Sequence, residues 1–385
     1  MSHVLQAEVL VVGAGPAGLA TSLALARRGR RVLLAERSKS SRRRLCGEFL
    51  SGDGCRVLEE LGCPPEADCP AIDSVLLSSR GGRRWETAVP GLGKGCSRSR
   101  LTESLSLACA DLGVERLDGV RVTVYPDQSL LASRDGVPLS IEVQRTVQAT
   151  GHAGAVRLRP ESGRHRRREW MAVAVHGSGQ VPLQVQLHAT RSGYIGLNPI
   201  EGGRLNVCGL LRTPGRSQES SDPLQILLEE ADANTMLQKI LESIVINPSS
   251  TATAAGLDFG RRRHPDNALT VGDAAGAPVP MLGQGLAAAL RGGQLLGEMV
   301  DEDLRSFGPG AGDEASCRLA TSRLTSRYRE AWKTEFSLRF AVGRSLQRAL
   351  LQPFVTDWLL RILSRLPTVG ARIVRVTRGS LESSG

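Results

Sequence analysis

Three glycines near the beginning of the sequence have the spacing of a phosphate-binding turn. Gly13, Gly15 and Gly18 follow residues 9–12, an uninterrupted apolar run typical of a strand buried on both faces. Gly13 permits the tight turn, Gly15 lets a pyrophosphate approach the backbone, and Gly18 lets a helix pack closely on the strand. The spacing therefore predicts a dinucleotide-binding turn.

The residues that follow complete a βαβ unit around this turn. Pro16 and Ala17 begin a helix rich in alanine and leucine, whose N-terminus offers unpaired N–H groups to phosphates. Residues 30–36 form a second apolar strand that ends at Glu36. Its carboxylate can accept hydrogen bonds from a ribose hydroxyl and would repel a 2′-phosphate. We therefore predict a dinucleotide site rather than a chance glycine-rich turn, with Arg37 beside it.

A second group of glycines lies far along the chain and gives the first turn a narrower meaning. Gly272 and Asp273 follow an apolar run, and Pro280 precedes Gly283-Gln284-Gly285, where a helix to residue 300 is expected. With the first turn, this order resembles the FAD-dependent superfamily that contains the para-hydroxybenzoate-hydroxylase-like monooxygenases and the geranylgeranyl reductases. The resemblance implies that Asp273 binds the ribityl chain and that the helix directs its positive end at the flavin ring.

Two further segments match this superfamily. In the run Arg98-Ser99-Arg100-Leu101-Thr102, the resemblance makes Arg98 an FAD contact and Arg100 its solvated neighbour, or the reverse. Cys46-Gly47-Glu48 is similar to the C-G-E-x-L-S segment of the geranylgeranyl-reductase-like members, which passes close to the flavin on the substrate side. Cys46 is therefore a candidate catalytic residue, or a buried thiol in a tight turn. Glu48 is expected on the substrate side as a hydrogen-bond anchor.

Other segments depart from the superfamily patterns. Residues 149–157 keep the alanine, glycine and arginine of the hydroxylase segment but lack its acid and serine, which weakens a standard hydroxylase assignment. The reductase strand Tyr-x-Trp-x-Phe-Pro reads Tyr194-Ile195-Gly196-Leu197-Asn198-Pro199 here. Tyr194 and Asn198 are expected on the substrate side, in a pocket roomier and more polar than a geranylgeranyl chain requires. The sequence contains no Trp-x-Trp-x-Ile-Pro segment, so halogenation is not favoured.

The resemblance predicts an enzyme, an FAD-dependent oxidoreductase. Because only one dinucleotide fingerprint is present, NADPH or NADH would bind transiently as the electron donor. The expected substrate is a medium-sized apolar metabolite that undergoes C=C reduction or a related redox step. The alternative is a flavin-dependent monooxygenase that hydroxylates an aromatic or polyketide-like substrate, since the scaffold does not fix the reaction. A non-catalytic FAD-bound protein is a third, less favoured interpretation.

Composition and charge limit the classes of partner and the location that we expect. The 385 residues carry a net charge of +10, but aromatic residues make up only 3%, which disfavours nucleic-acid binding. The eight cysteines form no C-x-x-C pair, so we expect neither a metal site nor a disulfide framework. No signal-like segment precedes the first strand, and a cytoplasmic location is expected. Residues 354–378 could form a basic amphipathic helix on a membrane surface, or pack on the body, because Pro367 interrupts the pattern.

The helices and strands that the sequence patterns predict around these residues indicate an α/β fold. We expect a Rossmann-type, glutathione-reductase-like FAD-binding domain in three pieces, an inserted antiparallel substrate-side sheet, and a helical C-terminal segment. The FAD-binding domain is expected to comprise residues 1–70, 96–160 and 255–305. The substrate-side sheet would comprise 71–95 and 161–254, and the C-terminal segment 316–385. Within them the patterns favour helices over 52–61, 98–112 and 222–243, a hairpin over 75–89, and strands at 120–124, 139–143 and 145–149.

Overall fold

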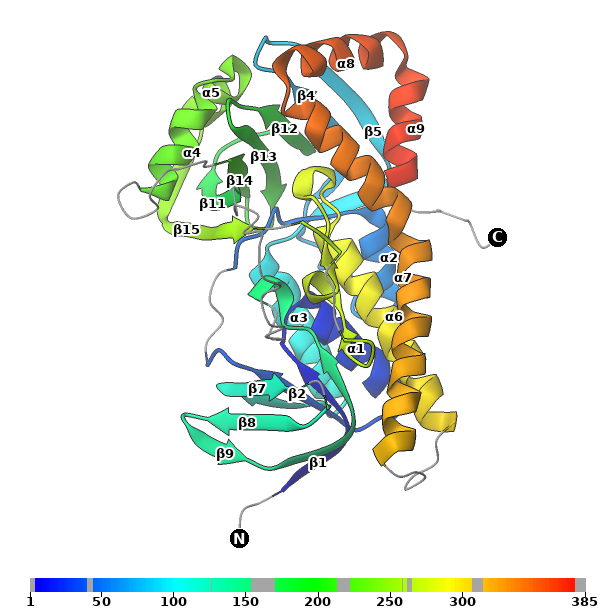
Figure 1. Ribbon diagram of the computed structural model, residues 1–385. Helices are drawn as coiled ribbons and strands as arrows, with labels where there is room; N and C mark the ends of the chain where they lie inside the picture. Colours follow the sequence, from blue (N-terminus) through cyan, green and yellow to red (C-terminus); the bar gives the residue numbers. More distant parts are fainter. Residues whose placement is uncertain are drawn as a thin grey trace, which may run out of the picture.

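The protein, as a computed structural model, is an α/β fold built on two large sheets (Figure 1). The structure describes residues 4–39, 44–125, 127–153, 170–212, 222–257, 259–261, 265–306 and 314–377. The first sheet has five parallel strands in the order β17-β10-β1-β2-β6. Its strands are β1 (Leu5–Val12), β2 (Val32–Glu36), β6 (Glu115–Asp118), β10 (Ile141–Gln148) and β17 (Leu269–Thr270).

Helix α1 (Pro16–Ala26) is buried among the first sheet, α3 (Arg98–Asp111) and α6 (Gly285–Ser306). Residues 16–25 of α1 are all buried, which suits a helix composed of alanine, leucine and small polar residues. Gly293 and Gly297 of α6 let the two helices approach closely, since a Cβ at Gly293 would lie 2.5 Å from the Ala17 carbonyl oxygen. This close packing holds the N-termini of α1 and α6 at the same end of the sheet.

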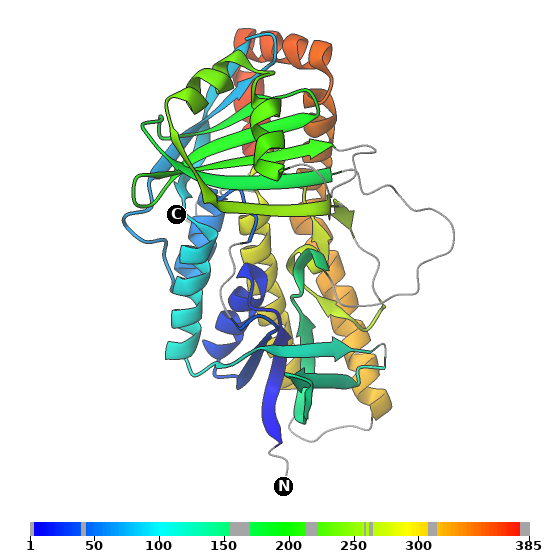
Figure 2. The ribbon, with the colours of Figure 1, turned by 90° about the vertical axis from the view of Figure 1, so that its left-hand side faces the viewer.

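The second sheet has eight strands in the order β15-β11-β14-β13-β12-β4-β5-β3. Helices α4 (Pro223–Ala231) and α5 (Thr235–Glu242) cover its outer face (Figure 2), where Met171, Val173 and Val175 pack beneath them. The strands are β3 (Phe49–Leu50), β4 (Ala71–Ser78), β5 (Arg84–Gly95), β11 (Trp170–Ser178), β12 (Gln184–Ala189), β13 (Gly193–Ile200), β14 (Arg204–Arg212) and β15 (Val245–Leu257). The alternate residues of β11, β13 and β14 face the opposite side.

Three C-terminal helices run along and over both sheets. The long helix α7 (Glu314–Leu350) spans most of the length of the molecule, and α8 (Pro353–Arg365) and α9 (Pro367–Thr377) lie at the end near β4 and β5 (Figure 1). There Leu360, Leu363 and Val374 join Val75, Leu77 and Trp85 in one apolar cluster. No helix among the described residues is long and apolar enough to cross a membrane.

Smaller elements complete the described chain. Helix α2 (Gly52–Glu60) follows β3, and β7 (Val120–Val124), β8 (Leu130–Arg134) and β9 (Val137–Leu139) form a meander. Strands β16 (Gly260–Arg261) and β18 (Gly276–Ala277) pair with each other. The 3-10 turns η1 (Gly151–Ala153), η2 (Gly272–Ala274) and η3 (Pro280–Leu282) lie at strand and helix ends.

The α/β class is confirmed, and several element boundaries differ from those predicted. The helix predicted over 222–243 is two helices, because the Asn234 side chain caps α5 by accepting from the Leu237 N–H. The two strands predicted within 139–149 are the single strand β10. The predicted hairpin is longer than expected, and Pro367 interrupts the predicted C-terminal helix, since α8 ends at Arg365 and α9 begins at Pro367. The sequence also predicts a glycine-rich linker over 306–315, most of which lies outside the described residues.

Candidate functional site

A continuous cavity of about 610 Å³ connects the glycine turn with the C-terminal helices. At one end it is lined by Gly15, Pro16 and Ala17 at the start of α1. At the other end it is lined by apolar side chains of β4, β5, α8 and α9, including Trp85, Leu363 and Val374. One internal space therefore joins the predicted dinucleotide turn to an apolar compartment.

The glycine turn combines tight packing on one side with open space on the other. Gly13 has a φ of +112°, and a Cβ there would lie 2.5 Å from the carbonyl oxygen of Ala149, which follows the neighbouring strand β10. A Cβ at Gly18 would lie 1.9 Å from the carbonyl oxygen of Gly13. At Gly15 the space is open: in the part of the chain that the structure describes, and apart from its chain neighbours, only the Arg98 guanidinium approaches, 3.6 Å from the position of a Cβ. Gly13 and Gly18 thus shape the turn, and Gly15 faces the cavity.

Glu36 ends β2 beside the turn and holds it by hydrogen bonds. Its carboxylate accepts from the backbone N–H of Ala14 and of Ser38, each at 3.0 Å, and pairs with Arg44 at 2.9 Å. Burial opposes the ionised form, but these two backbone donors and the Arg44 charge outweigh it and lower the pKa of Glu36. The acid is therefore ionised at neutral pH, next to the cavity rather than on its wall.

Two arginines predicted from one motif take different places. Arg98, the first residue of α3, lines the cavity, whereas Arg100 binds Glu66 and Asp68 on the other side of the helix. Arg37 and Arg44 also line the cavity. Arg44 was not predicted from the sequence, because nothing distinguishes it within its arginine cluster. Cations thus gather at the same end as the glycine turn, where an anionic phosphate would bind.

The later glycine group faces the cavity from α6. Gly272 and Gly283 have positive φ values of 64° and 62°, and Asp273 and Pro280 line the cavity within η2 and η3. Gly285 begins α6 and also lines the cavity, and outside its own turn of helix no atom of the described residues lies within 4 Å of where its Cβ would be. The positive end of α6 is therefore open to the cavity.

Gln284 lies just before α6 but is not on the cavity wall. The residue is buried, and its Nε2 atom has no hydrogen-bond partner among the described residues.

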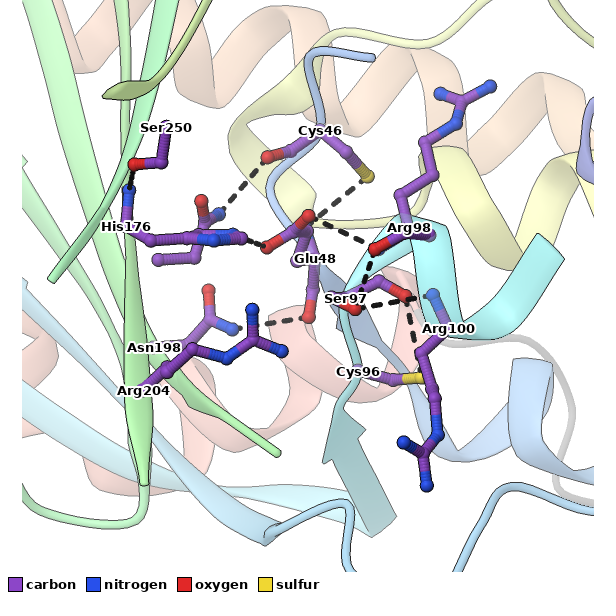
Figure 3. Close-up of polar contacts among 12 residues, drawn as sticks. Cys46, Glu48, Cys96, Ser97, Arg98, Arg100, His176, Asn198, Arg204 and Ser250 are labelled. Carbon is purple, nitrogen blue, oxygen red and sulfur yellow. Dashed lines mark hydrogen bonds and ion pairs between the residues drawn. The ribbon is translucent and has the colours of Figure 1, made fainter. Parts of the chain in front are cut away.

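Cys46 and Glu48 lie on the cavity wall in an irregular segment before β3 (Figure 3). The Glu48 N–H donates to the Cys46 sulfur at 3.3 Å. Burial, aided by the charges of Glu48 and Asp273, outweighs the opposing charge of Arg98 and raises the pKa of the Cys46 thiol. Cys46 is therefore a protonated thiol at neutral pH, not a thiolate nucleophile.

Glu48 joins the segment to α3 and to the eight-stranded sheet through its side chain and its backbone. It is 2% exposed, and its carboxylate accepts from the Arg98 backbone N–H at 3.1 Å and contacts His176 Nε2 at 2.7 Å (Figure 3). Its carbonyl oxygen accepts from Asn198 Nδ2 at 3.2 Å. Sequence reasoning missed His176, although a histidine within the apolar strand that begins at Trp170 is a signal that could have found it.

The predicted substrate-side residues lie on the inner face of the eight-stranded sheet. Tyr194 and Asn198 both line the cavity from β13. The Tyr194 hydroxyl donates to Gln347 of α7 at 3.3 Å, and burial raises its pKa well above the usual value. Tyr194 is thus a neutral, anchored wall residue.

Within the described chain, three buried side chains have ligand atoms within 4.8 Å of one another: Cys69, Cys96 and Glu201. Glu201 already accepts from the Ser97 N–H at 2.8 Å and pairs with Arg204. Burial raises the pKa of both thiols. The group is accounted for by these contacts, which hold the residues before Arg98.

The chain resembles known FAD-binding proteins in sequence and in fold. A family model described as an FAD binding domain matches residues 6–76. The chain is 25% identical to digeranylgeranylglycerophospholipid reductase 2 of Methanopyrus kandleri over 373 residues, covering 86% of this chain and 84% of that protein. It is 26% identical to menaquinone reductase of Mycobacterium tuberculosis over 334 residues, covering 79% of each.

Solved structures share the fold. The flavin-dependent brominase Bmp2 gives a TM-score of 0.78 at 16% identity, covering 99% of this chain and 96% of that one. A geranylgeranyl bacteriochlorophyll reductase-like protein from Thermoplasma acidophilum gives 0.76 at 17% identity, covering 97% and 95%. At these identities the likeness concerns the fold alone.

The family match and the fold are those of a flavoprotein with an FAD binding domain. The chain is an FAD-dependent oxidoreductase, and its resemblance to the superfamily of hydroxylase-like monooxygenases and geranylgeranyl reductases is confirmed.

Proposed function

We propose that this oxidoreductase is reduced by NADPH or NADH and acts on a medium-sized apolar metabolite, by C=C reduction or a related redox step. The observation that carries the proposal is the continuity of the cavity, which runs from Gly15 to the apolar side chains of α8 and α9. A cofactor held at the first end would meet a substrate held at the second.

The chain's residues fit an FAD in this cavity. The open space at Gly15 and the approach of Arg98 suit the pyrophosphate at the N-terminus of α1, and ionised Glu36 has lone pairs left for a ribose hydroxyl. Asp273 would bind the ribityl chain, and the open first turn of α6 at Gly285 would face the flavin ring. The bound flavin supplies hydride transfer. On this assignment, the parallel sheet and α6 hold the cofactor, and the eight-stranded sheet forms the substrate side.

Reduction of a C=C bond consumes a hydride and a proton, and the chain must supply the proton. On the cavity wall, Cys46 and Tyr194 are two groups that remain protonated at neutral pH because burial raises their pKa values, and of the thiols Cys46 is the one in the segment that approaches Asp273 and Arg98. The Tyr194 proton is already donated to Gln347. We infer that Cys46 holds the proton, while the apolar walls exclude water from the reacting atoms.

The relatives favour reduction over oxygenation. The proteins matched over most of their length are named reductases of a glycerophospholipid and of menaquinone. The match to 6-methylpretetramide 4-monooxygenase of Streptomyces rimosus is 43% identical but spans only 77 residues, 19% of this chain. That match supports the alternative, a monooxygenase acting on an aromatic or polyketide-like substrate. A non-catalytic FAD-bound protein is the remaining alternative.

Anaerobic mixing of the FAD-loaded protein with NADPH or NADH, followed by oxygen, separates these functions. The proposal predicts bleaching of the flavin absorbance on mixing and its return in oxygen without a C4a-oxygen adduct. An adduct detected after oxygen would favour the monooxygenase. No bleaching with either donor would contradict both enzymatic functions.

We further propose that α8 and α9 rest on an anionic membrane surface, from which an apolar substrate would enter. Phe354 and Trp358 of α8 are 91% and 63% exposed, unusual values for large apolar side chains. Arginines flank them on the same two helices and are exposed: Arg361, Arg365, Arg372 and Arg375. The inner side of these helices lines the cavity, so a single layer of helix separates it from the proposed membrane.

A further inference from the structure

The inner face of the eight-stranded sheet is organised in transverse rows. The register places His176 of β11 opposite Asn206 of β14, and Asn206 opposite Asn198 of β13. Because side chains alternate along a strand, these three residues lie on the same face as Tyr194, which lines the cavity. One polar row therefore crosses three neighbouring strands.

Every member of this row contacts the Cys46–Glu48 segment. His176 Nε2 lies 2.7 Å from a Glu48 carboxylate oxygen, and Asn198 Nδ2 donates to the Glu48 carbonyl oxygen at 3.2 Å. Asn206 Nδ2 donates to the Cys46 carbonyl oxygen at 3.0 Å. Figure 3 shows His176 and Asn198 reaching Glu48 from the sheet while Arg98 approaches from α3.

The neighbouring row differs in size and polarity. It consists of Ala174, Cys208 and Gly196, in the same register on the same strands. These small residues leave room on the face of the sheet, and Cys208 and Gly196 line the cavity. From the sheet, the polar row supplies three side-chain contacts to the segment, and the backbone N–H groups of Cys96 and Arg98 add two more, to the Glu48 carbonyl oxygen at 3.0 Å and to its carboxylate at 3.1 Å.

The segment itself needs such contacts. Glu48 has a φ of +53°, a left-handed conformation that a residue with a side chain rarely adopts unless its surroundings impose it. The His176 position is likewise specialised, because the pairing of β11 with β15 is irregular there. The His176 N–H donates to the side chain of Ser250 at 2.8 Å. Such irregularities re-aim side chains near functional sites.

We propose that His176, Asn206 and Asn198 form a polar clamp that positions the Cys46–Glu48 segment on the cavity wall, with His176 fixing the Glu48 carboxylate. His176 is thereby a positioning residue that acts through Glu48. Since Glu48 also accepts from the first N–H of α3, the clamp sets Cys46 and Arg98 relative to each other. Its chemical purpose rests on the proposed function, because it holds the thiol that would carry the proton.

The test measures alkylation of Cys46 by iodoacetamide in the FAD-loaded protein, resolved by peptide mass spectrometry, with Cys208 as the reference thiol on the same cavity. His176→Leu removes the contact with Glu48, and His176→Gln keeps an amide donor. His188→Leu is the matched control: His188 is a buried histidine of the same sheet, and it contacts Ser78 and Gln186 instead of the segment. Asn206→Ala breaks the clamp at its other contact.

The clamp predicts that His176→Leu and Asn206→Ala speed alkylation of Cys46 by about tenfold relative to Cys208, since each variant removes a hydrogen bond that restrains the segment. His176→Gln and His188→Leu should stay near the wild-type rate. Equal rates in all variants, or acceleration by His188→Leu as well, would overturn the proposal. A His176→Gln rate as high as that of His176→Leu would also overturn it.

Two provisions keep the outcome decisive. If His176→Leu yields no folded protein, Asn206→Ala carries the test with the same expectations. The measurement involves no turnover, so it is independent of the reaction. If the alkylation rates change as predicted but neither NADPH nor NADH bleaches the flavin, the proposed clamp stands and only the proposed function is contradicted.

Discussion

The two ends of the cavity are built in different ways. At the glycine end the wall is formed mainly by backbone. Gly13 and Gly18 leave no room for a Cβ, whereas Gly15 and Gly285 leave space open. At the far end, side chains from β4, β5, α8 and α9 form the wall, and Leu363, Val374 and Trp85 pack into one cluster. The first end is shaped mainly by backbone, from segments as far apart as residues 13–18, 149 and 285, whereas the second is walled by side chains.

The sharpest way to break the glycine end is Gly18→Ala. The new Cβ would lie 1.9 Å from a backbone oxygen of Gly13, so α1 and β1 must separate. We expect the free energy of unfolding to fall by about 3 kcal/mol or more and bound FAD to be lost. Urea unfolding and flavin content measure both. Gly285→Ala is the control: it should change the apoprotein's free energy of unfolding by less than about 0.5 kcal/mol and lower only flavin content. Wild-type stability in Gly18→Ala would refute this.

Leu363→Ala breaks the side-chain end instead. Leu363 is 3% exposed and packs against Trp85, so the expected loss in the free energy of unfolding is about 2–4 kcal/mol. Flavin content should remain that of the wild type, because this end does not hold the cofactor. Leu366→Ala, at an exposed position of the same region, should cost less than about 0.5 kcal/mol. A parallel loss of flavin in Leu363→Ala would mean that the two ends are not separate.

The comparison explains how far the sequence alone could reach. Short-range spacing was enough to predict the turn at Gly13–Gly18 and the α/β class. It also predicted that one of Arg98 and Arg100 contacts the cofactor while the other is its solvated neighbour. His176, Asn206 and Arg44 could not be predicted, because their roles depend on strand register and on chain crossings between distant segments. For the same reason, the sequence did not predict that the inner faces of α8 and α9 line the cavity. Periodicity shows that a helix is amphipathic, but not what it covers.

Arg98→Ala sharpens the account of the glycine end. Arg98 lines the cavity beside Gly15, and removal of a charged hydrogen-bond donor costs about 1.5–3 kcal/mol, which raises the Kd for FAD at least about tenfold. Fluorescence titration of the apoprotein with FAD measures this. Arg100→Ala, which loses only its contacts with Glu66 and Asp68, should leave the Kd within about twofold. If Arg100→Ala has the larger effect, the two roles are exchanged.

The smallest effect on stability is expected at the outer surface of the far end. Phe354→Ser combined with Trp358→Ser should change the free energy of unfolding by less than about 0.5 kcal/mol, because both side chains are exposed. Co-sedimentation with vesicles containing phosphatidylglycerol should fall about tenfold or more, since each buried aromatic contributes about 1.5–3 kcal/mol. Leu131→Ser, an exposed position on β8 at the opposite end of the molecule (Figure 1), is the control. Unchanged binding in the double variant, or wild-type binding that ignores anionic lipid, would remove the membrane proposal.

The central claim is that cofactor and apolar substrate share one cavity, and the structure of the FAD-loaded protein tests it most directly. The account predicts the pyrophosphate at Gly15 and Arg98, and the flavin ring between the Cys46–Glu48 segment and the start of α6. The apolar arm toward Leu363 and Val374 should remain open beside the ring. A flavin ring seated outside this cavity, or an apolar arm walled off from it, would contradict the account.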